Sequence, residues 1–337
     1  MYKDIVFLDG IAEDYLQDIT KFVREWESYS PIISVITSGS TGTPKTIDFT
    51  KKQVEASAKY TGQFFNFKKG ETLLLNLSPN YIAGKLMLVR AMVYGMKILV
   101  APLKSNPLEN LNFGEPIKLG AFVPSQVQEI LNHAKAKKNY LQIENVLIGG
   151  ASIPNQLEQE IEKLSNKNFA SFGMTETLTH FALRKITNQN DIYTCLPGIQ
   201  INQDDRGCLV VEPNNVVQQQ LITNDSIEFI DTKNFKWKGR LDNVINSGGV
   251  KIFPESDEKL IEHLFKNQWY YLSSKKNERW GEELVLVVED EQWSIENQEK
   301  ILHQIEKILP KYHAPKSIIF IDKFDETGNG KIKRKKF

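Results

Sequence analysis

The 337-residue chain contains only two cysteines, Cys195 and Cys208. Two thiols cannot build a disulfide scaffold, and their spacing matches no zinc motif. A reducing cytoplasm is therefore the simplest setting. The chain also lacks an excess of charge, because 42 Lys+Arg residues balance 42 Asp+Glu residues. No global attraction to nucleic acid follows from that balance.

A long apolar run is missing as well. The most apolar stretch, residues 81–102, is interrupted by Lys85, Arg90 and Lys97. We therefore expect a buried helix followed by a strand, and no membrane span. The first residues are acidic where a secretory signal would be basic. The histidines outside the motifs described below show no paired metal-ligand spacing.

Short apolar runs alternate with amphipathic stretches over the first half of the chain. Strands are predicted at 32–36, 72–75, 97–100, 119–123 and 146–148, and helices at 51–65, 83–94, 125–136 and 154–164. This alternation is typical of βαβ units and a largely parallel sheet. After about Cys195, shorter strands at 208–211, 216–221 and 227–230 predict a small β-rich subdomain.

The pattern changes again beyond Gly239. Helices near 255–265 and 295–309, with strands at 284–289 and 317–321, predict a small α+β unit. The sequence thus predicts an α/β protein with two domains. Residues 1–239 form a large domain that includes the β-rich subdomain, and residues 240–337 form a small C-terminal domain.

The clearest chemical signal follows the strand at 32–36. Seven consecutive residues, 37–43, are Gly, Ser or Thr, and Lys45 comes soon after. Glycines permit tight turns, amides and hydroxyls converge on an anion, and the lysine adds charge. The segment is a predicted phosphate-binding loop, with a plain surface turn as the weaker alternative. It is not a Walker A motif, because the required Gly-Lys pair is absent.

Three further segments carry chemistry. Residues 171–177 (SFGMTET) combine a ring, a glycine, hydroxyls and a carboxylate, which can stack a base and hold a metal beside phosphate. The other two are residues 239–255 (GRLDNVINSGGVKIFPE) and residues 327–334 (TGNGKIKR). In this order, the four segments resemble the adenylate-forming, AMP-binding superfamily of acyl-CoA synthetases, luciferases and peptide-synthetase adenylation domains. The resemblance runs from about residue 32 to the end.

The resemblance implies a nucleotide site. The loop that would hold the β- and γ-phosphates of ATP contributes Thr37, Ser38, Gly39, Ser40, Thr41, Gly42 and Lys45. The residues implied on the AMP side are Gly150, Ala151, Phe172 and Gly173, with Phe172 against adenine. Thr175 would lie beside the α-phosphate, and Glu176 would bind Mg2+. Asp225 and Arg240 would take the ribose hydroxyls, although Asn224 stands where the family has glycine.

The resemblance also implies two half-reactions at one pocket. The catalytic Lys331, on a mobile C-terminal domain, would serve adenylate formation. Rotation about the hinge residue Asp242 would then withdraw Lys331 and admit CoA past Gly249. The expected cofactors and substrates are therefore ATP, Mg2+ and CoA. Because this chemistry brings anions together, it needs positioning and positive charge more than a general base.

The segments 81–85, 123–126 and 146–154 are most similar to the o-succinylbenzoate-CoA ligases of menaquinone biosynthesis. That substrate is a dicarboxylate, so a cation should meet the carboxylate that does not react. Lys85, in the first turn of a helix, is the candidate, and a solvated lysine is its alternative role. Tyr81, Thr179 and His180 are predicted to line the same pocket.

Several alternatives stay open. Another aryl- or acyl-CoA synthetase, a carrier-protein-loading adenylation enzyme and a non-catalytic AMP-binding protein share these motifs. We expect small-molecule partners and neither nucleic acid nor membrane. Only about 36 residues precede the phosphate loop, fewer than in most relatives. The large domain is therefore expected to be truncated at its front, with either a compact fold or a homodimer partner covering the exposed face.

Overall fold

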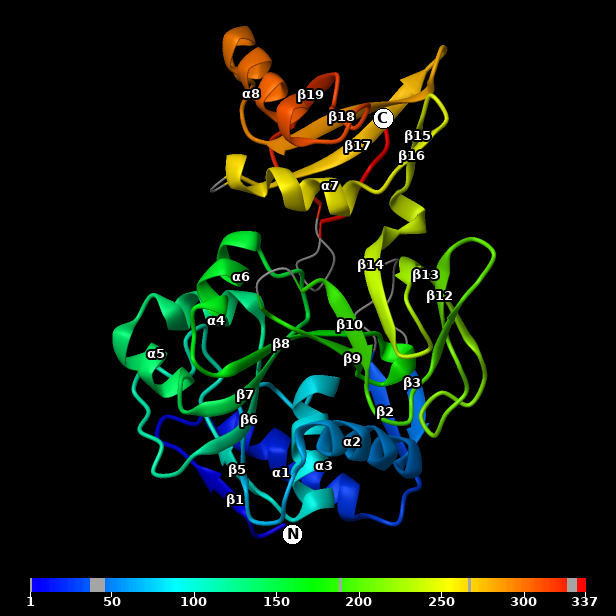
Figure 1. The fold of residues 1–337 in the computed structure, drawn as a ribbon. Helices are drawn as coiled ribbons and strands as arrows, with labels where there is room; N and C mark the ends of the chain where they lie inside the picture. Colours follow the sequence, from blue (N-terminus) through cyan, green and yellow to red (C-terminus); the bar gives the residue numbers. More distant parts are fainter. Residues whose placement is uncertain (1, 37–45, 188–189, 266–267, 326–331) are drawn as a thin grey trace.

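The computed structural model describes residues 2–36, 46–187, 190–265, 268–325 and 332–337 (Figure 1). Its largest feature is a twelve-stranded sheet with the order β1-β5-β4-β6-β7-β8-β9-β10-β14-β13-β12-β11. Strands that neighbour one another up to β8 run parallel, and those from β8 onward run antiparallel. The direction of the sheet therefore changes at one place, between β8 and β9.

Helices cover both faces of the parallel half. Its strands are β1 (Ile5–Phe7), β4 (Thr72–Leu75), β5 (Lys97–Val100), β6 (Ile117–Phe122), β7 (Ile143–Ile148) and β8 (Lys167–Gly173). One face carries α1 (Glu13–Glu27), α2 (Lys51–Phe65) and α3 (Ile82–Tyr94), and the other carries α4 (Pro124–Leu131), α5 (Ala134–Tyr140) and α6 (Asn155–Glu162). Successive residues of β4 alternate between the two cores, because strand side chains point to opposite faces.

Several predicted elements match the structure, and others differ. The helix predicted at 125–136 is broken, because His133 has an extended backbone and begins the separate helix α5. The strand predicted at 216–221 is wrong over most of its length. The Asn214 side-chain oxygen accepts hydrogen bonds from the backbone N–H groups of Val216 and Val217. The chain therefore turns before β13 begins at Leu221. The strand β2 (Ile32–Ile36) forms, but it pairs with β3 (Thr46–Thr50) in a separate antiparallel sheet.

The β-rich segment continues the large sheet as its antiparallel half. Its strands are β9 (His180–Lys185), β10 (Ile192–Cys195), β11 (Ile201–Gln203), β12 (Cys208–Val211), β13 (Leu221–Phe229) and β14 (Asn234–Arg240). The register between β13 and β14 shifts: Ser226 lies opposite Gly239, whereas Ile227 lies opposite Trp237. Lys238 is therefore left without a partner, as in a β-bulge.

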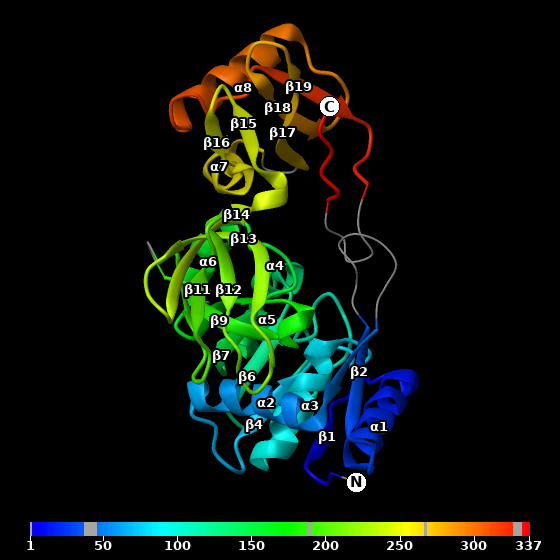
Figure 2. The ribbon, with the colours of Figure 1, turned by 90° about the vertical axis from the view of Figure 1, so that its right-hand side faces the viewer.

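The rest of the chain builds a five-stranded sheet that lies beyond β14 (Figures 1 and 2). It contains β15 (Ile245–Ser247), β16 (Val250–Ile252), β17 (Tyr270–Asn277), β18 (Gly281–Glu289) and β19 (Ser317–Ile321), with helices α7 (Pro254–Ile261) and α8 (Ile295–Ile308). The helix predicted at 255–265 ends early and continues as a 3-10 turn, Glu262–Leu264. Among the described residues, no helix is both long and apolar enough to cross a membrane.

Gly84 allows the start of α3 to lie against the preceding loop. A Cβ at this position would lie 2.3 Å from the Ser78 carbonyl oxygen and 2.6 Å from that of Leu77. We expect Gly84→Ala to lower the free energy of unfolding by about 2 kcal/mol, because this backbone clash outweighs the gain of about 1 kcal/mol in helix propensity. Urea unfolding midpoints measure the change. Gly114→Ala, with no atom within 4 Å, is the matched control, and equal midpoints for the two variants would contradict this packing.

Candidate functional site

The carboxyl ends of β6, β7 and β8 lie side by side. Phe122 is opposite Ile148, and Ile148 is opposite Ala170. The residues that follow these strands therefore meet at one edge of the sheet, where α/β proteins commonly bind ligands. Gly150 and Ala151 are exposed there after β7, and Phe172 and Gly173 end β8.

The turn between β8 and β9 is tightly built. A Cβ on Gly173 would lie 2.4 Å from the Thr179 carbonyl oxygen and 2.5 Å from the His180 Cα, so only glycine fits. The Thr177 hydroxyl accepts the backbone N–H of Met174 at 3.1 Å and closes the turn. This geometry leaves Thr175 half-buried and Glu176 exposed. The Glu176 carboxylate makes no hydrogen bond or ion pair with a described residue, which suits a metal ligand.

Phe172 belongs to an aromatic cluster. Its ring centroid lies 5.3 Å from that of Phe235, 5.3 Å from that of Tyr193 and 5.6 Å from that of Phe181. These tilted and edge-on contacts favour one ring orientation. The cluster spans β8, β9, β10 and β14, and so links the end of the parallel half to the antiparallel strands.

Asp225 and Arg240 are direct partners on β13 and β14. Asp225 is buried, at 7% exposure, and its Oδ1 accepts the indole N–H of Trp237 at 2.9 Å. The Arg240 Nη1 is 3.6 Å from Asp225 Oδ2, and Arg240 Nη2 donates to Asp242 Oδ2 at 2.7 Å. The structure thus brings the two predicted ribose ligands together and adds Trp237, which sequence reasoning missed.

Asn224 connects β13 to the predicted hinge. Its Nδ2 donates to Asp242 Oδ1 at 3.0 Å, and its Oδ1 accepts from Arg206 Nη1 at 3.2 Å. Residue 224 is where the resembled family has glycine. The asparagine therefore gives this chain a side-chain contact with Asp242 that glycine could not make.

Arg90 is the second residue that sequence reasoning missed. It lies on α3 with 2% exposure, and its Nη1 meets only the Met87 sulfur, at 3.3 Å. The Nε and Nη2 atoms have no hydrogen-bond partner among the described residues. Burial lowers the pKa of Arg90 to about 9, so the group is charged at neutral pH. A buried charge without a counter-ion is costly, which indicates a site for an anion.

His180 lies near this arginine. Its Nε2 is 3.3 Å from the Thr61 hydroxyl, and its Nδ1 is 3.5 Å from the Thr179 hydroxyl. Burial, followed by the positive charge of Arg90, holds the pKa of His180 well below its usual value. The imidazole is therefore neutral, and Arg90 is the charged member of the pair. Because the charge of Arg90 acts on His180, the α3 helix lies beside the β8–β9 turn.

Tyr81 and Lys85, the two pocket residues predicted at the start of α3, have surroundings unlike those of Arg90. Tyr81 is 67% exposed. Lys85 donates to the Ser34 carbonyl oxygen at 2.9 Å, and its ammonium is 5.4 Å from the Phe22 ring centre. Five residues along a helix correspond to about 140° around its axis, so Lys85 and Arg90 face different sides. The Lys85 ammonium is thus already engaged by β2 and α1.

The remaining predicted residues belong to the C-terminal part and to the loop after β2. Gly249 is exposed in the turn between β15 and β16, with φ +84. Residues 325 and 333, which flank the predicted catalytic lysine, are joined by a backbone hydrogen bond of 2.7 Å. The predicted residues outside the described part of the chain are Thr37, Ser38, Gly39, Ser40, Thr41, Gly42, Lys45 and Lys331.

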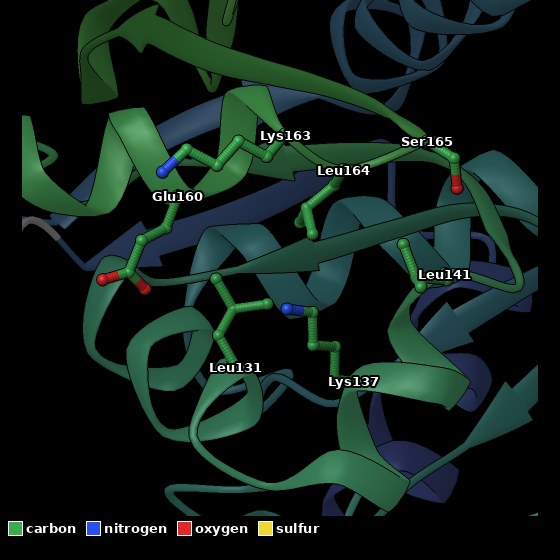
Figure 3. A pocket seen from close by; sticks show the side chains of 7 residues that line it. All are labelled: Leu131, Lys137, Leu141, Glu160, Lys163, Leu164 and Ser165. Carbon is green, nitrogen blue, oxygen red and sulfur yellow. The ribbon is translucent and has the colours of Figure 1, made fainter.

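A groove of about 380 Å³ lies elsewhere, between α4, α5 and the end of α6 (Figure 3). Its lining consists of Leu131, Lys137, Leu141, Glu160, Lys163, Leu164 and Ser165. None of the predicted site residues lines this groove. The candidate site is therefore the sheet edge around the β8–β9 turn, together with β13, β14 and the buried end of Arg90.

Comparisons with known proteins identify the family of the chain. The family model of AMP-binding enzymes matches residues 12–215. A 2-succinylbenzoate–CoA ligase from Lactococcus lactis is 25% identical over 98% of this chain and 79% of its own length. A solved structure from Dyadobacter fermentans, described as an acyl-CoA synthetase (AMP-forming)/AMP-acid ligase II-like protein, is 34% identical with a TM-score of 0.66, covering 96% of this chain and 94% of that one.

A third similar protein is the o-succinylbenzoate coenzyme A synthetase (MenE) of Bacillus subtilis, solved in complex with ATP and magnesium ion. It is 20% identical with a TM-score of 0.72, covering 89% of this chain and 68% of that one. At that identity the likeness concerns the fold. The two solved structures, which cover 96% and 89% of this chain, share its fold.

The neutral state of His180 gives a pH prediction. In the unfolded chain His180 titrates near its usual value, so below pH 6.5 the unfolded state binds more protons than the folded state. Stability therefore falls as the pH drops, by at most about 1.4 kcal/mol per unit. We expect His180→Gln to flatten the loss of unfolding free energy between pH 7 and pH 5. Exposed His303→Gln is the control, and parallel profiles for His180→Gln and wild type would refute the assignment.

Proposed function

The chain belongs to the AMP-binding enzyme family, and we propose that it is an ATP-dependent acid-CoA ligase acting on o-succinylbenzoate. The acid and ATP would give an acyl-adenylate and pyrophosphate, and the CoA thiol would then displace AMP. The observation that carries the choice of a dicarboxylic acid is the buried guanidinium of Arg90, whose Nε and Nη2 lack described partners. The names of similar proteins, such as the Lactococcus ligase, support the same acid.

We place the nucleotide along the junction of the two halves of the large sheet. Phe172 would lie against adenine, with Gly150, Ala151 and Gly173 forming the adjacent edge. Asp225 and Arg240 would take the ribose hydroxyls. Thr175 would donate to the α-phosphate, and exposed Glu176 would hold Mg2+ together with phosphate oxygens. A bound Mg2+ supplies charge that offsets the phosphates.

We place the acid between α3 and the β8–β9 turn. A carboxylate can accept two parallel N–H bonds from one guanidinium, and this would compensate the charge of Arg90. His180 and Thr179 offer neutral hydrogen-bond partners, and Tyr81 would line the mouth. A monocarboxylic acid would leave Arg90 buried and unpaired. The site would therefore select for a second carboxylate, a role that the sequence alone suggested for Lys85.

We further propose two domains, residues 1–239 and 240–337, that alternate about Asp242. The contacts across this division are polar: the Asn155 backbone N–H donates to Glu262 at 2.7 Å, and Lys259 is 3.3 Å from Glu158. Polar contacts of this kind suit relative motion better than an apolar interface. One orientation would bring Lys331 to the phosphates, and the other would bring Gly249 to the thiol path. Buried, unpaired Cys195 and Cys208 fit a reducing cytoplasm.

The reaction is tested by acid-dependent ATP–pyrophosphate exchange. We expect Lys331→Ala to lower exchange with o-succinylbenzoate by about 10²-fold or more, since a charge that stabilises the α-phosphate during adenylyl transfer is lost. Thioester formation from preformed acyl-adenylate should change little. Exposed Lys333→Ala is the control. Equal loss in both half-reactions would contradict alternation, and absence of exchange with every acid in wild type would favour a non-catalytic AMP-binding protein.

The acid site is tested by comparing two substrates. We expect Arg90→Met to lower the ratio of kcat/KM for o-succinylbenzoate over 3-benzoylpropionate, which lacks the ring carboxylate, by about 10²-fold. Lys85→Met is the matched control on the same helix and should leave the ratio unchanged. A loss confined to Lys85→Met would restore the original assignment. A wild type that prefers other aryl or fatty acids would point to a different acyl-CoA synthetase.

A further inference from the structure

We propose that Trp237 is a positioning residue for the ribose-binding carboxylate of Asp225. The inference rests on the proposed function, because it concerns how Asp225 is presented to a nucleotide. Its starting point is the hydrogen bond of 2.9 Å from the Trp237 indole N–H to Asp225 Oδ1. Neither the four motif segments nor the resemblance assigns a role to Trp237.

The β-bulge explains how Trp237 reaches Asp225. Residues three apart on a regular strand face opposite sides, so Trp237 and Arg240 would normally be separated by the sheet. The unpaired residue Lys238 changes this alternation. Arg240 then lies opposite Asp225, and Trp237 lies opposite Ile227, two residues further along the same face. The bulge thus places a neutral donor and a cation on either side of one carboxylate.

The bulge is itself held in place. The Ser256 hydroxyl of α7 donates to the Lys238 carbonyl oxygen at 2.5 Å. A bulged residue loses its ladder partner, so its carbonyl needs another donor. Ser256 supplies that donor from outside the large sheet.

The contacts of Asp225 show what the indole contributes. Among the described residues, Trp237 makes the one hydrogen bond to this carboxylate, since Arg240 Nη1 is 3.6 Å from Oδ2. Arg240 instead donates to Asp242. By holding Oδ1, Trp237 keeps the carboxylate from turning to close a full ion pair with Arg240. Both partners then stay available for a pair of ribose hydroxyls.

Calorimetric binding of two nucleotides tests the proposal. AMP offers both ribose hydroxyls, and 2′,3′-dideoxy-AMP offers neither. We expect Trp237→Phe, which keeps an aromatic ring and removes the N–H, to weaken AMP binding by about three- to tenfold. Binding of the dideoxy nucleotide should be unchanged, because the lost orientation matters only to hydroxyls. In an Asp225→Ala background, Trp237→Phe should have no further effect.

The chain offers a matched control in Trp293, whose indole N–H donates to Asp290 at 2.8 Å in the second sheet's unit. Trp293→Phe removes the same kind of bond and should leave both affinities unchanged. Equal weakening of AMP and dideoxy-AMP by Trp237→Phe would show a packing role and overturn the proposal, as would unchanged AMP binding. If wild type itself binds both nucleotides equally, the ribose role of Asp225 fails. If wild type binds neither, the proposed function fails.

Discussion

A positive charge enclosed by an apolar core is the constraint on which the rest of the site depends. Arg90 lies on a helix whose neighbouring side chains are almost fully buried, and the described residues offer its guanidinium only a sulfur atom. Removing such a charge from water costs several kcal/mol unless an anion compensates it. The fold places α3, and with it this buried charge, beside the β8–β9 turn. Burial, followed by the charge of Arg90, holds the pKa of His180 low, so the surroundings contain one cation and a neutral imidazole.

The site lies where the large sheet changes direction. The parallel half supplies open strand ends, and the antiparallel half supplies the face that carries Asp225 and Arg240. Gly173 joins the two, because its missing side chain lets β9 return directly against β8. In the proposed function, acid and nucleotide would meet at this junction. Asp242, the proposed hinge, contacts Arg240 of β14 and Asn224 of β13. Motion about Asp242 would therefore move the proposed ribose ligands.

The sequence was sufficient where chemistry depends on residue type and order. Phe172, Glu176 and Arg240 lie in the motif segments, and Asp225 was implied by the resemblance. The structure places Asp225 opposite Arg240, and the roles of all four residues stay predictions. The sequence was insufficient where burial or irregular backbone decides. In the sequence, Arg90 is only an interruption of an apolar run. Lys85 was predicted to bind the second carboxylate of the acid, but it donates to the Ser34 carbonyl oxygen. Trp237 was hidden because a bulge cannot be recognised from alternation, and the helix at 125–136 was overextended because its periodicity continues across the break at His133.

The unfolding midpoint of Arg90→Met, measured with and without o-succinylbenzoate, tests the central claim most directly. If the guanidinium is an uncompensated charge awaiting an anion, the variant without ligand should be at least as stable as wild type, because methionine fills similar space without charge. The acid should raise the midpoint of wild type and leave that of the variant unchanged. A variant that is markedly less stable without ligand, yet still stabilised by the acid, would contradict the account.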